Sequence, residues 1–419
     1  MNTQYIKTEL ARCHGTIDKL SEQTKKMQKR TNDAIKSHTS SSQLLNSITR
    51  CLENKLFGKI YKRSSTTNRA TIVVPYNDGV ALISKEKQIE ELKLCVQLGI
   101  RDTLTNIITF NSISVISNTV VHENDTISAV YVDNMFWVVC NDVVYSSANG
   151  EIWTEAGRFS NVTLVCVRAH DHEVDVIGSD NAQRLYHFNY NKDDNIWNGG
   201  RVESIQATGV FTSFDYDRHY NMLVCGYKID YTNITVNALL FHYERDNGVW
   251  IELHMIYKDY YWNSVTYNRA TDNWIVTYGQ ITNGSTNLVD KMLSVSVDSN
   301  TLAIRPNMST KYAYALNIGT CYVSKIARMI SVVKTKETAG MMSRTLELVG
   351  SLWTDSTRKL ELTDHHEPMF TVVDDEHDCM IVSTIKTNET GYELVLFALG
   401  YPITEHIKRL TTIAIKNQL

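Results

Sequence analysis

The amino-acid sequence predicts a mainly β protein, a β-propeller of about six divergent four-stranded repeats preceded by an N-terminal parallel α-helical coiled coil. Three observations predict this fold. Apolar residues follow a heptad pattern near the N-terminus, a strand-turn-strand pattern recurs six times further on, and several repeats end in tryptophan. We therefore divide the chain into a stalk over 1–62, a neck over 63–108, the propeller over 109–404 and a C-terminal tail over 405–419.

In the stalk, apolar side chains recur at alternating steps of four and three residues. Such a row stays on one face of a helix only if the helix supercoils around partner helices. The seam is formed by Ile6, Leu10, Cys13, Ile17, Leu20, Met27, Leu45, Ile48 and Leu52. We therefore expect the protein to be a homo-oligomer through these residues.

The middle of this seam is polar. Thr31, His38 and Ser41 occupy positions where leucine or isoleucine would bind best, which can fix the register of a coiled coil at a cost in stability. The alternative is that the serine-rich run 37–42 forms a hinge between two shorter helices.

The neck has a strand-like segment over 70–75, a turn signal at 77–79 and an apolar stripe over 85–98 with helical spacing. We expect one short strand and one helix here.

The propeller repeats each begin with an apolar strand, make a short polar turn and return on a more apolar strand. They start at Ala129, Val165, Ser213, Val265, Thr320 and Phe370, roughly 36 to 55 residues apart, which is about the length of one propeller blade. Closure of the ring requires the last blade to be tied to the first, and we expect 112–117 and 392–397 to lie in the same blade.

A second hairpin follows in most repeats and ends in Trp153, Trp197, Trp250 or Trp353. We expect each indole to fill the wedge between neighbouring blades, because a large flat side chain suits that space.

The run Ser146-x-Ala148-x-Gly150-x-x-Trp153 resembles the Asp-box, or bacterial neuraminidase repeat, with Ala148 in place of aspartate. The rhythm of the repeats is similar to that of propeller heads in bacteriophage tail-fibre proteins. This resemblance implies a virion protein made in the host cytoplasm. It also implies a trimer, with other virion tail proteins and a host surface receptor as partners.

Composition narrows the possible functions. With 42 Lys and Arg against 46 Asp and Glu, the chain has no excess of the positive charge typical of nucleic-acid binders. We see no run approaching the ~18 apolar residues of a membrane span, so we expect no membrane insertion. The eight cysteines include no CxxC pair, and we assign no disulfide.

We expect the head to bind a receptor or partner without catalysing a reaction. The alternative is a sialidase-like glycan hydrolase acting on host surface polysaccharide, which needs an arginine cluster for the substrate carboxylate. Four arginines fall near equivalent turns of successive repeats, namely Arg168, Arg218, Arg269 and Arg328. Because solvated residues of any type are accepted at such turns, we assign no catalytic residue and no cofactor.

His170, His172 and Asp175 have side chains of the types that bind divalent metals, but their setting is that of a solvated polar turn, and we assign no metal site. Aromatic side chains suit contact surfaces, and the densest cluster of them consists of Tyr257, Tyr260, Tyr261 and Trp262. We expect this cluster to bind the partner. The alternative is that Trp262 packs between blades.

Overall fold

The computed structural model describes Glu22, Lys25, Lys26 and most of the residues between 57 and 400. Gaps in this second part lie at 66–70, 78, 89, 102–107, 171–172, 206, 231–234, 254–259, 282–291, 310–314, 325–326, 338–339, 357–366, 375–378 and 389–390. The chain divides into two compact units, Met1–Leu56 and Phe57–Leu419.

The first unit contains nearly all of the predicted stalk. Glu22, Lys25 and Lys26 are helical, and Lys26 Nζ lies 2.9 Å from Glu22 Oε1, an exposed i,i+4 ion pair. The seam residues lie outside the described residues, so the coiled coil and the oligomer stay predictions. The C-terminal tail also lies outside them.

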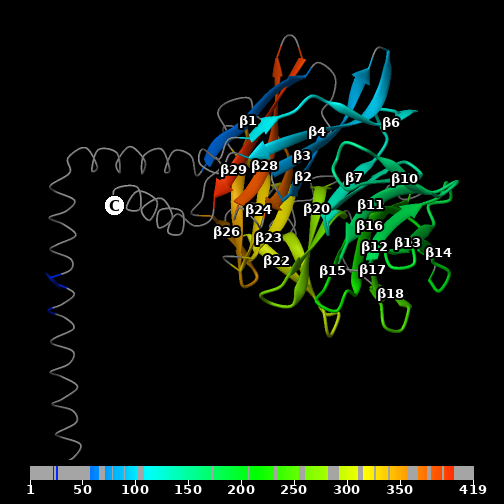
Figure 1. Ribbon diagram of the computed structural model, residues 1–419. Helices are drawn as coiled ribbons and strands as arrows, with labels where there is room; N and C mark the ends of the chain where they lie inside the picture. Colours follow the sequence, from blue (N-terminus) through cyan, green and yellow to red (C-terminus); the bar gives the residue numbers. More distant parts are fainter. Residues whose placement is uncertain are drawn as a thin grey trace, which may run out of the picture. The chain divides into compact units, whose positions relative to one another are not determined.

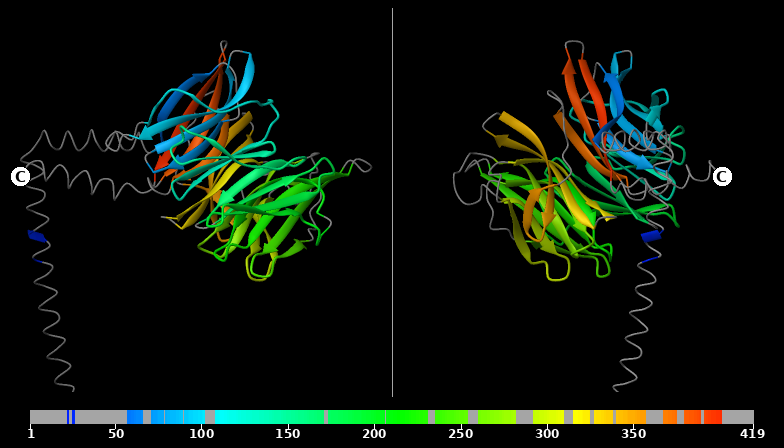
Figure 2. Two further views of the ribbon diagram at one scale, coloured as in Figure 1. Left: turned by 45° about the vertical axis from the view of Figure 1, so that its right-hand side comes forward. Right: turned by 90° about the vertical axis from the view of Figure 1, so that its left-hand side faces the viewer.

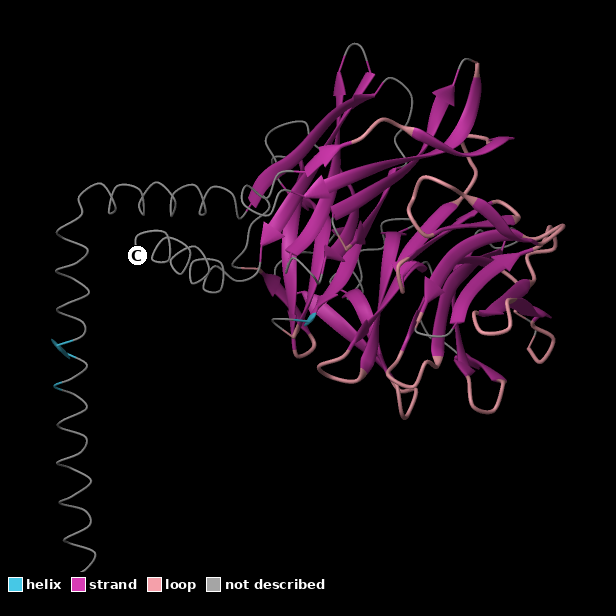
Figure 3. Ribbon diagram, in the orientation of Figure 1, coloured by secondary structure: helices cyan, strands magenta, loops and turns pink. Residues whose placement is uncertain are grey.

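The second unit is built of strands (Figure 3). The first sheet has five strands: β2 (Thr71–Tyr76), β3 (Gly79–Gln88), β4 (Glu91–Arg101), β5 (Ile108–Phe110) and β6 (Ser114–Val120). The next sheet contains β7 (Ile127–Val132), β8 (Met135–Cys140), β9 (Val143–Ser147) and β10 (Thr154–Arg158). A third sheet contains β11 (Thr163–Ala169), β12 (Glu173–Ser179), β13 (Leu185–Asn191) and β14 (Ile196–Arg201). A fourth contains β15 (Val210–Tyr216), β16 (Met222–Asp230), β17 (Thr235–Glu244) and β18 (Val249–Leu253).

An eight-stranded sheet follows, and its two halves each have the order of one repeat. The first half contains β19 (Tyr260–Asn268), β20 (Asn273–Ile281), β21 (Met292–Asp298) and β22 (Ile304–Ser309). The second contains β23 (Ala315–Val323), β24 (Arg328–Glu337), β25 (Gly340–Val349) and β26 (Leu352–Asp355). The two halves join through a short parallel pairing of β22 with β26. The last sheet contains β27 (Glu367–Asp374), β28 (Cys379–Asn388), β29 (Gly391–Gly400) and β1 (Phe57–Ser65).

The first strands of these units contact one another in a closed ring. Each meets the next along the chain, in the order β2, β7, β11, β15, β19, β23 and β27, and β27 returns to β2. This is the arrangement of a β-propeller, with sheets placed around a common axis (Figure 1).

The six predicted hairpins are confirmed, because each is an antiparallel pair within one of these sheets. The prediction for the neck was wrong. Residues 85–98 form the end of β3 and most of β4 instead of a helix, and β2 to β5 belong with β6 to one sheet. The helical spacing of Leu92, Cys95 and Val96 was misleading because both faces of this sheet are largely covered.

The predicted closure was also wrong. Residues 112–117 belong to the segment around β6, which pairs with β4, whereas 392–397 lie in β29, which pairs with β28 and β1. The ring is closed by β1, which runs antiparallel to β29 as the outermost strand of the last sheet (Figure 2). The N-terminal and C-terminal strands therefore share one sheet.

Buried apolar clusters lie between neighbouring sheets. One joins Val74, Ile83 and Leu94 to Phe136 and Val138. Four further clusters each join residues of two neighbouring sheets in the same way, and a fifth joins the two halves of the eight-stranded sheet. The second strands β8 and β12 are buried along most of their length, and β8 is accordingly a continuous apolar run. The five cysteines with described burial are free and buried.

The four tryptophans at or next to the outermost strands pack against the preceding sheet, which confirms the prediction. The Trp197 indole Nε1 donates to the Ala156 carbonyl at 2.8 Å, and Trp353 Nε1 donates to Ser294 Oγ at 3.0 Å. Trp153 and Trp250 belong to the corresponding clusters. The Trp197 indole lies so close to residue 157 that only glycine fits there, because a Cβ would lie 2.6 Å from the Trp197 Nε1 atom.

We find no helix among the described residues with the length and hydropathy needed to cross a membrane.

The Trp353 wedge gives a stability prediction. Trp353→Ala should lower the free energy of unfolding by about 3–5 kcal/mol, because it empties a buried site and leaves the Ser294 hydroxyl without this donor. Denaturant unfolding followed by circular dichroism measures the change. Ile152→Ala, at a side chain that is 72% exposed, is the control and should change little. Equal effects of the two substitutions would refute the wedge role.

The closing strand gives a second prediction. A chain beginning at residue 66 lacks β1 and should lose several kcal/mol of stability, since each ladder hydrogen bond contributes about 1 kcal/mol and the edge of β29 becomes unpaired. Its thermal unfolding is compared with that of a chain beginning at residue 57, which keeps β1. Identical midpoints would show that β1 does not close the ring.

Candidate functional site

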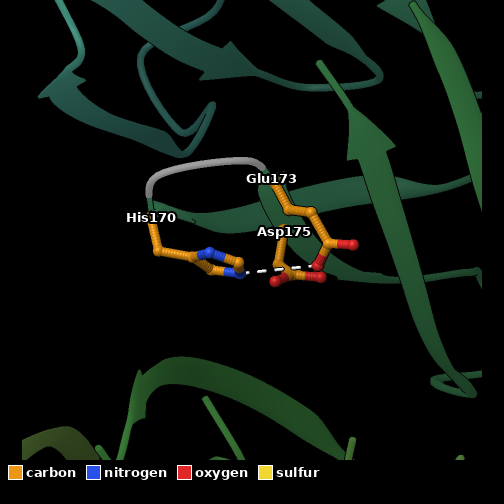
Figure 4. Close-up of side chains that lie close together, drawn as sticks. All are labelled: His170, Glu173 and Asp175. Carbon is orange, nitrogen blue, oxygen red and sulfur yellow. Dashed lines mark ion pairs between the residues drawn. The ribbon is translucent and has the colours of Figure 1, made fainter. Parts of the chain in front are cut away.

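A cluster of charged and aromatic side chains lies between the β11–β14 sheet and the β15–β18 sheet. The hairpin from β11 to β12 brings His170 opposite Glu173, with the His170 amide donating to the Glu173 carbonyl at 3.0 Å. Glu173 and Asp175 project from the same side of β12, because residues two apart in a strand face the same way. Figure 4 shows the His170 ring directed toward both carboxylates.

Asp175 is the centre of the cluster, and its side chain is fully buried. Its carboxylate accepts hydrogen bonds from His187 Nε2 at 2.7 Å and Asn189 Nδ2 at 3.0 Å, both on β13. It also accepts from the Tyr216 hydroxyl at 2.6 Å and from an Arg245 nitrogen at 2.5 Å, both contributed by the neighbouring sheet. One carboxylate therefore joins the two sheets.

Burial by itself would raise the pKa of Asp175. The hydrogen bond and charge of His187, the charge of Arg245 and the Tyr216 hydrogen bond outweigh it and hold the pKa well below its ordinary value. Burial and the adjacent Asp175 charge raise the pKa of Tyr216 well above its ordinary value. Asp175 is thus ionised and Tyr216 protonated at neutral pH.

Arg245, in the turn after β17, connects several parts of the cluster. Its guanidinium pairs with Glu173 and Asp175, and its Nε donates to the Tyr220 carbonyl at 3.1 Å. Its backbone amide donates to Asn221 Oδ1 at 3.0 Å. A planar group with five donors in fixed directions suits this bridging role better than lysine would.

His170 lies among aromatic rings, cations and the Glu173 carboxylate, whose Oε2 is 3.4 Å from its Nε2 (Figure 4). Its imidazole stacks on Tyr220 with centroids 4.2 Å apart, and meets Tyr216 edge-on at 5.3 Å. Burial, followed by the positive charge of Arg245, lowers the pKa of His170. The imidazole is therefore neutral near pH 7 and can accept a proton.

Lys192, after β13, adds a second cation beside His170. Its Nζ lies 2.7 Å from Asp133 Oδ2 and donates to the His170 carbonyl at 2.8 Å. Asp133 belongs to the turn between β7 and β8, so a third sheet contributes to this face.

His170, Glu173 and Asp175 offer ligand atoms within 4.8 Å of one another, a spacing compatible with a divalent metal. His172, which the metal interpretation also used, lies outside the described residues. The carboxylate of Asp175 already accepts four hydrogen bonds, and the Arg245 charge opposes a second cation. The arrangement therefore fits a charge network better than a metal centre.

The predicted aromatic site is only partly described. Tyr257 lies outside the described residues, and for Tyr260, Tyr261 and Trp262 the structure gives their place at the start of β19 but no side chains. Neither the binding role nor the wedge alternative is tested.

The four recurrent arginines differ in their surroundings. Arg218 pairs with Asp272 at 3.1 Å, and Arg328 pairs with Glu347 within its own sheet. Arg168 and Arg269 both act electrostatically on Asp215, a carboxyl on β15 whose pKa burial raises. The sialidase-like interpretation needs an arginine cluster around one substrate carboxylate, and Arg218 and Arg328 instead pair separately with acids of their own.

Sequence reasoning missed Arg245, His187, Tyr216 and Tyr220, and it treated Asp175 as part of a solvated turn. One signal was present: Asp175 interrupts the apolar run Val174-Asp175-Val176-Ile177. A buried acid in such a strand needs partners.

No family model and no curated protein matches the sequence. A PL25 polysaccharide lyase, an ulvan lyase bound to GlcA(1-4)Rha3S, is similar in structure, with 9% identity, TM-score 0.53, and coverage of 82% of this chain and 96% of that one. A chain of the mitotic checkpoint complex matches with 9% identity, TM-score 0.50, and coverage of 82% and 93%. The β-propeller domain of the Trilobed protease from Pyrococcus furiosus matches with 8% identity, TM-score 0.49, and coverage of 80% and 94%.

These comparisons show a shared fold alone. They nevertheless correct our prediction that the head is not an enzyme, because a polysaccharide lyase is among the proteins of similar structure. That prediction rested on the interpretation of the four recurrent arginines as solvated turn residues, which is a weak argument in a fold that enzymes also use.

The Asp175 network gives a stability prediction. Asp175→Asn should destabilise the protein by about 3–5 kcal/mol, because it leaves the partly buried Arg245 charge without the buried one of its two carboxylate partners. Chemical denaturation measures the loss. Glu155→Gln, in an exposed pair with Arg158, is the control and should have a small effect. A variant of Asp175 as stable as the native protein would contradict the role given to this carboxylate.

Proposed function

We propose that the propeller cleaves an acidic polysaccharide at the cluster around His170. The observation that carries this proposal is a neutral imidazole placed beside an exposed tyrosine, Tyr220, and two cations, Arg245 and Lys192. Cations attract the carboxylates of uronic acid residues, and a neutral imidazole can remove a proton.

The reaction class that this arrangement favours is β-elimination. His170, whose side chain is 11% exposed, would take the proton from the carbon that bears the sugar carboxylate. The electrons of that C–H bond would form a C=C double bond to the next ring carbon, the bond from that carbon to the glycosidic oxygen would break, and the leaving oxygen would take a proton from water. Positive charge near the carboxylate makes such a proton easier to remove, since negative charge develops there in the transition state.

Hydrolysis by two carboxylates suits the site less well. A retaining glycosidase needs both carboxyl groups on the substrate, about 5–5.5 Å apart. Glu173 is partly exposed, but Asp175 has no exposed surface and is held by four donors. Asp175 is therefore unable to reach a sugar.

The solved structure of a polysaccharide lyase with GlcA(1-4)Rha3S supports the choice of substrate class, in that a similar fold can bind an acidic sugar chain. The choice of residues rests on the cluster of this chain.

We further infer that the head has seven blades. Seven first strands follow one another in the ring, and counting the two halves of the eight-stranded sheet separately gives seven sheets within the described residues. The sequence predicted about six because the sheet of β2 to β6 was assigned to the neck.

The heptad pattern of residues 6–52 supports a further proposal, a trimeric coiled-coil stalk that presents the head. On a bacteriophage virion, such a fibre would join other tail proteins and contact polysaccharide on the host surface.

Polysaccharide cleavage is testable directly. The full-length protein is incubated with glucuronate-containing polysaccharides, and both new reducing ends and the ultraviolet absorbance of unsaturated uronate are recorded. His170→Gln should lower the rate at least about 100-fold, as expected for loss of a general base. His122→Ala is the control, because His122 is exposed and lies between β6 and β7, outside the sheets that form the cluster.

Three results would contradict the proposal. The first is no cleavage of any acidic polysaccharide, and the second is an unchanged rate in the His170 variant. The third is reducing ends without unsaturated product, which would indicate hydrolysis and exclude elimination.

A further inference from the structure

Tyr220 has a backbone conformation that its side chain does not favour. Its φ is +61°, in the left-handed region that suits glycine and that bulky residues rarely adopt. Residues held in this region commonly lie at functional sites, where the surrounding structure enforces the conformation.

The turn around Tyr220 is held by a buried aspartate. Asp217 Oδ1 accepts the backbone amides of His219 at 2.7 Å and Asn221 at 2.9 Å, and its carbonyl accepts the Tyr220 amide at 3.2 Å. Arg245 Nε holds the Tyr220 carbonyl from the other side. Two independent groups therefore enforce the left-handed conformation.

The result of this enforced conformation is an exposed aromatic ring. The side chain of Tyr220 is 38% exposed even though it stacks on His170 with an interplanar angle of 21°. Tyr216 meets the Tyr220 ring edge-on at 6.3 Å, which fixes its orientation further. A flat ring whose position is fixed in this way is a suitable platform for the apolar face of a sugar.

We propose that Tyr220 is a stacking platform: it binds one sugar ring of an acidic polysaccharide on the face turned away from His170, so that a neighbouring sugar of the same chain lies beside His170. This inference rests on the proposed function for its choice of ligand. The platform supplies the apolar contact. Lys192 and Arg245 lie beside His170 and already pair with Asp133 and with Glu173 and Asp175, so a sugar carboxylate would bind them by replacing part of this pairing.

Binding and stability of Tyr220 variants test the platform. The probes are a glucuronate oligosaccharide and its carboxyl-reduced form, titrated by calorimetry into the full-length protein carrying His170→Gln, so that binding is measured without turnover. Tyr220→Phe keeps the ring and should bind the acidic probe as before. Tyr220→Gly and Tyr220→Ala should each weaken its binding about tenfold.

The glycine variant separates a binding role from a structural one. Glycine adopts a φ of +61° without strain, so Tyr220→Gly should melt at or above the temperature of Tyr220→Ala while binding equally poorly. The carboxyl-reduced probe should bind more weakly than the acidic one to the parent protein.

Two results would overturn the inference. One is full affinity for the acidic probe in Tyr220→Gly, and the other is loss of affinity accompanied by unfolding in both small variants. Failure of cleavage with retained, Tyr220-dependent binding would instead refute the proposed reaction and leave the platform standing.

Discussion

The carboxylate of Asp175 is the constraint on which the candidate site depends. An isolated carboxylate does not stay ionised inside a protein, so its burial requires donors, and here they come from two sheets. Arg245 is fixed by this charge, and Arg245 in turn holds the Tyr220 carbonyl and lies close enough to His170 to lower its pKa. One buried charge thus positions the base, the cation and the exposed ring.

The fold was largely predictable because its signals are local. Each hairpin shows apolar alternation and a polar turn, and the tryptophans mark the outermost strands. The errors came from non-local pairing. Whether β1 pairs with β29 depends on a contact between the two ends of the head, and the helical spacing over 85–98 is equally compatible with a strand covered on both faces.

The candidate site was less predictable for a physical reason. Asp175, His187, Tyr216 and Arg245 come from four strands or turns, and no short motif spans them. The residue types of His170 and Asp175 indicated possible metal ligands, yet sequence spacing could not show that Asp175 is buried. The lowered pKa of His170 comes first from burial and then from the charge of Arg245, which is 75 residues away. Only the packing of the two sheets brings these groups together.

A double-mutant cycle between Asp175→Asn and Arg245→Met tests most directly whether this charge pair couples the two sheets. The free energies of unfolding of the native protein, both single variants and the double variant are measured by chemical denaturation. A buried, hydrogen-bonded pair predicts a coupling energy of at least about 1 kcal/mol, with the double variant less destabilised than the sum of the single variants. Additive effects would contradict the account.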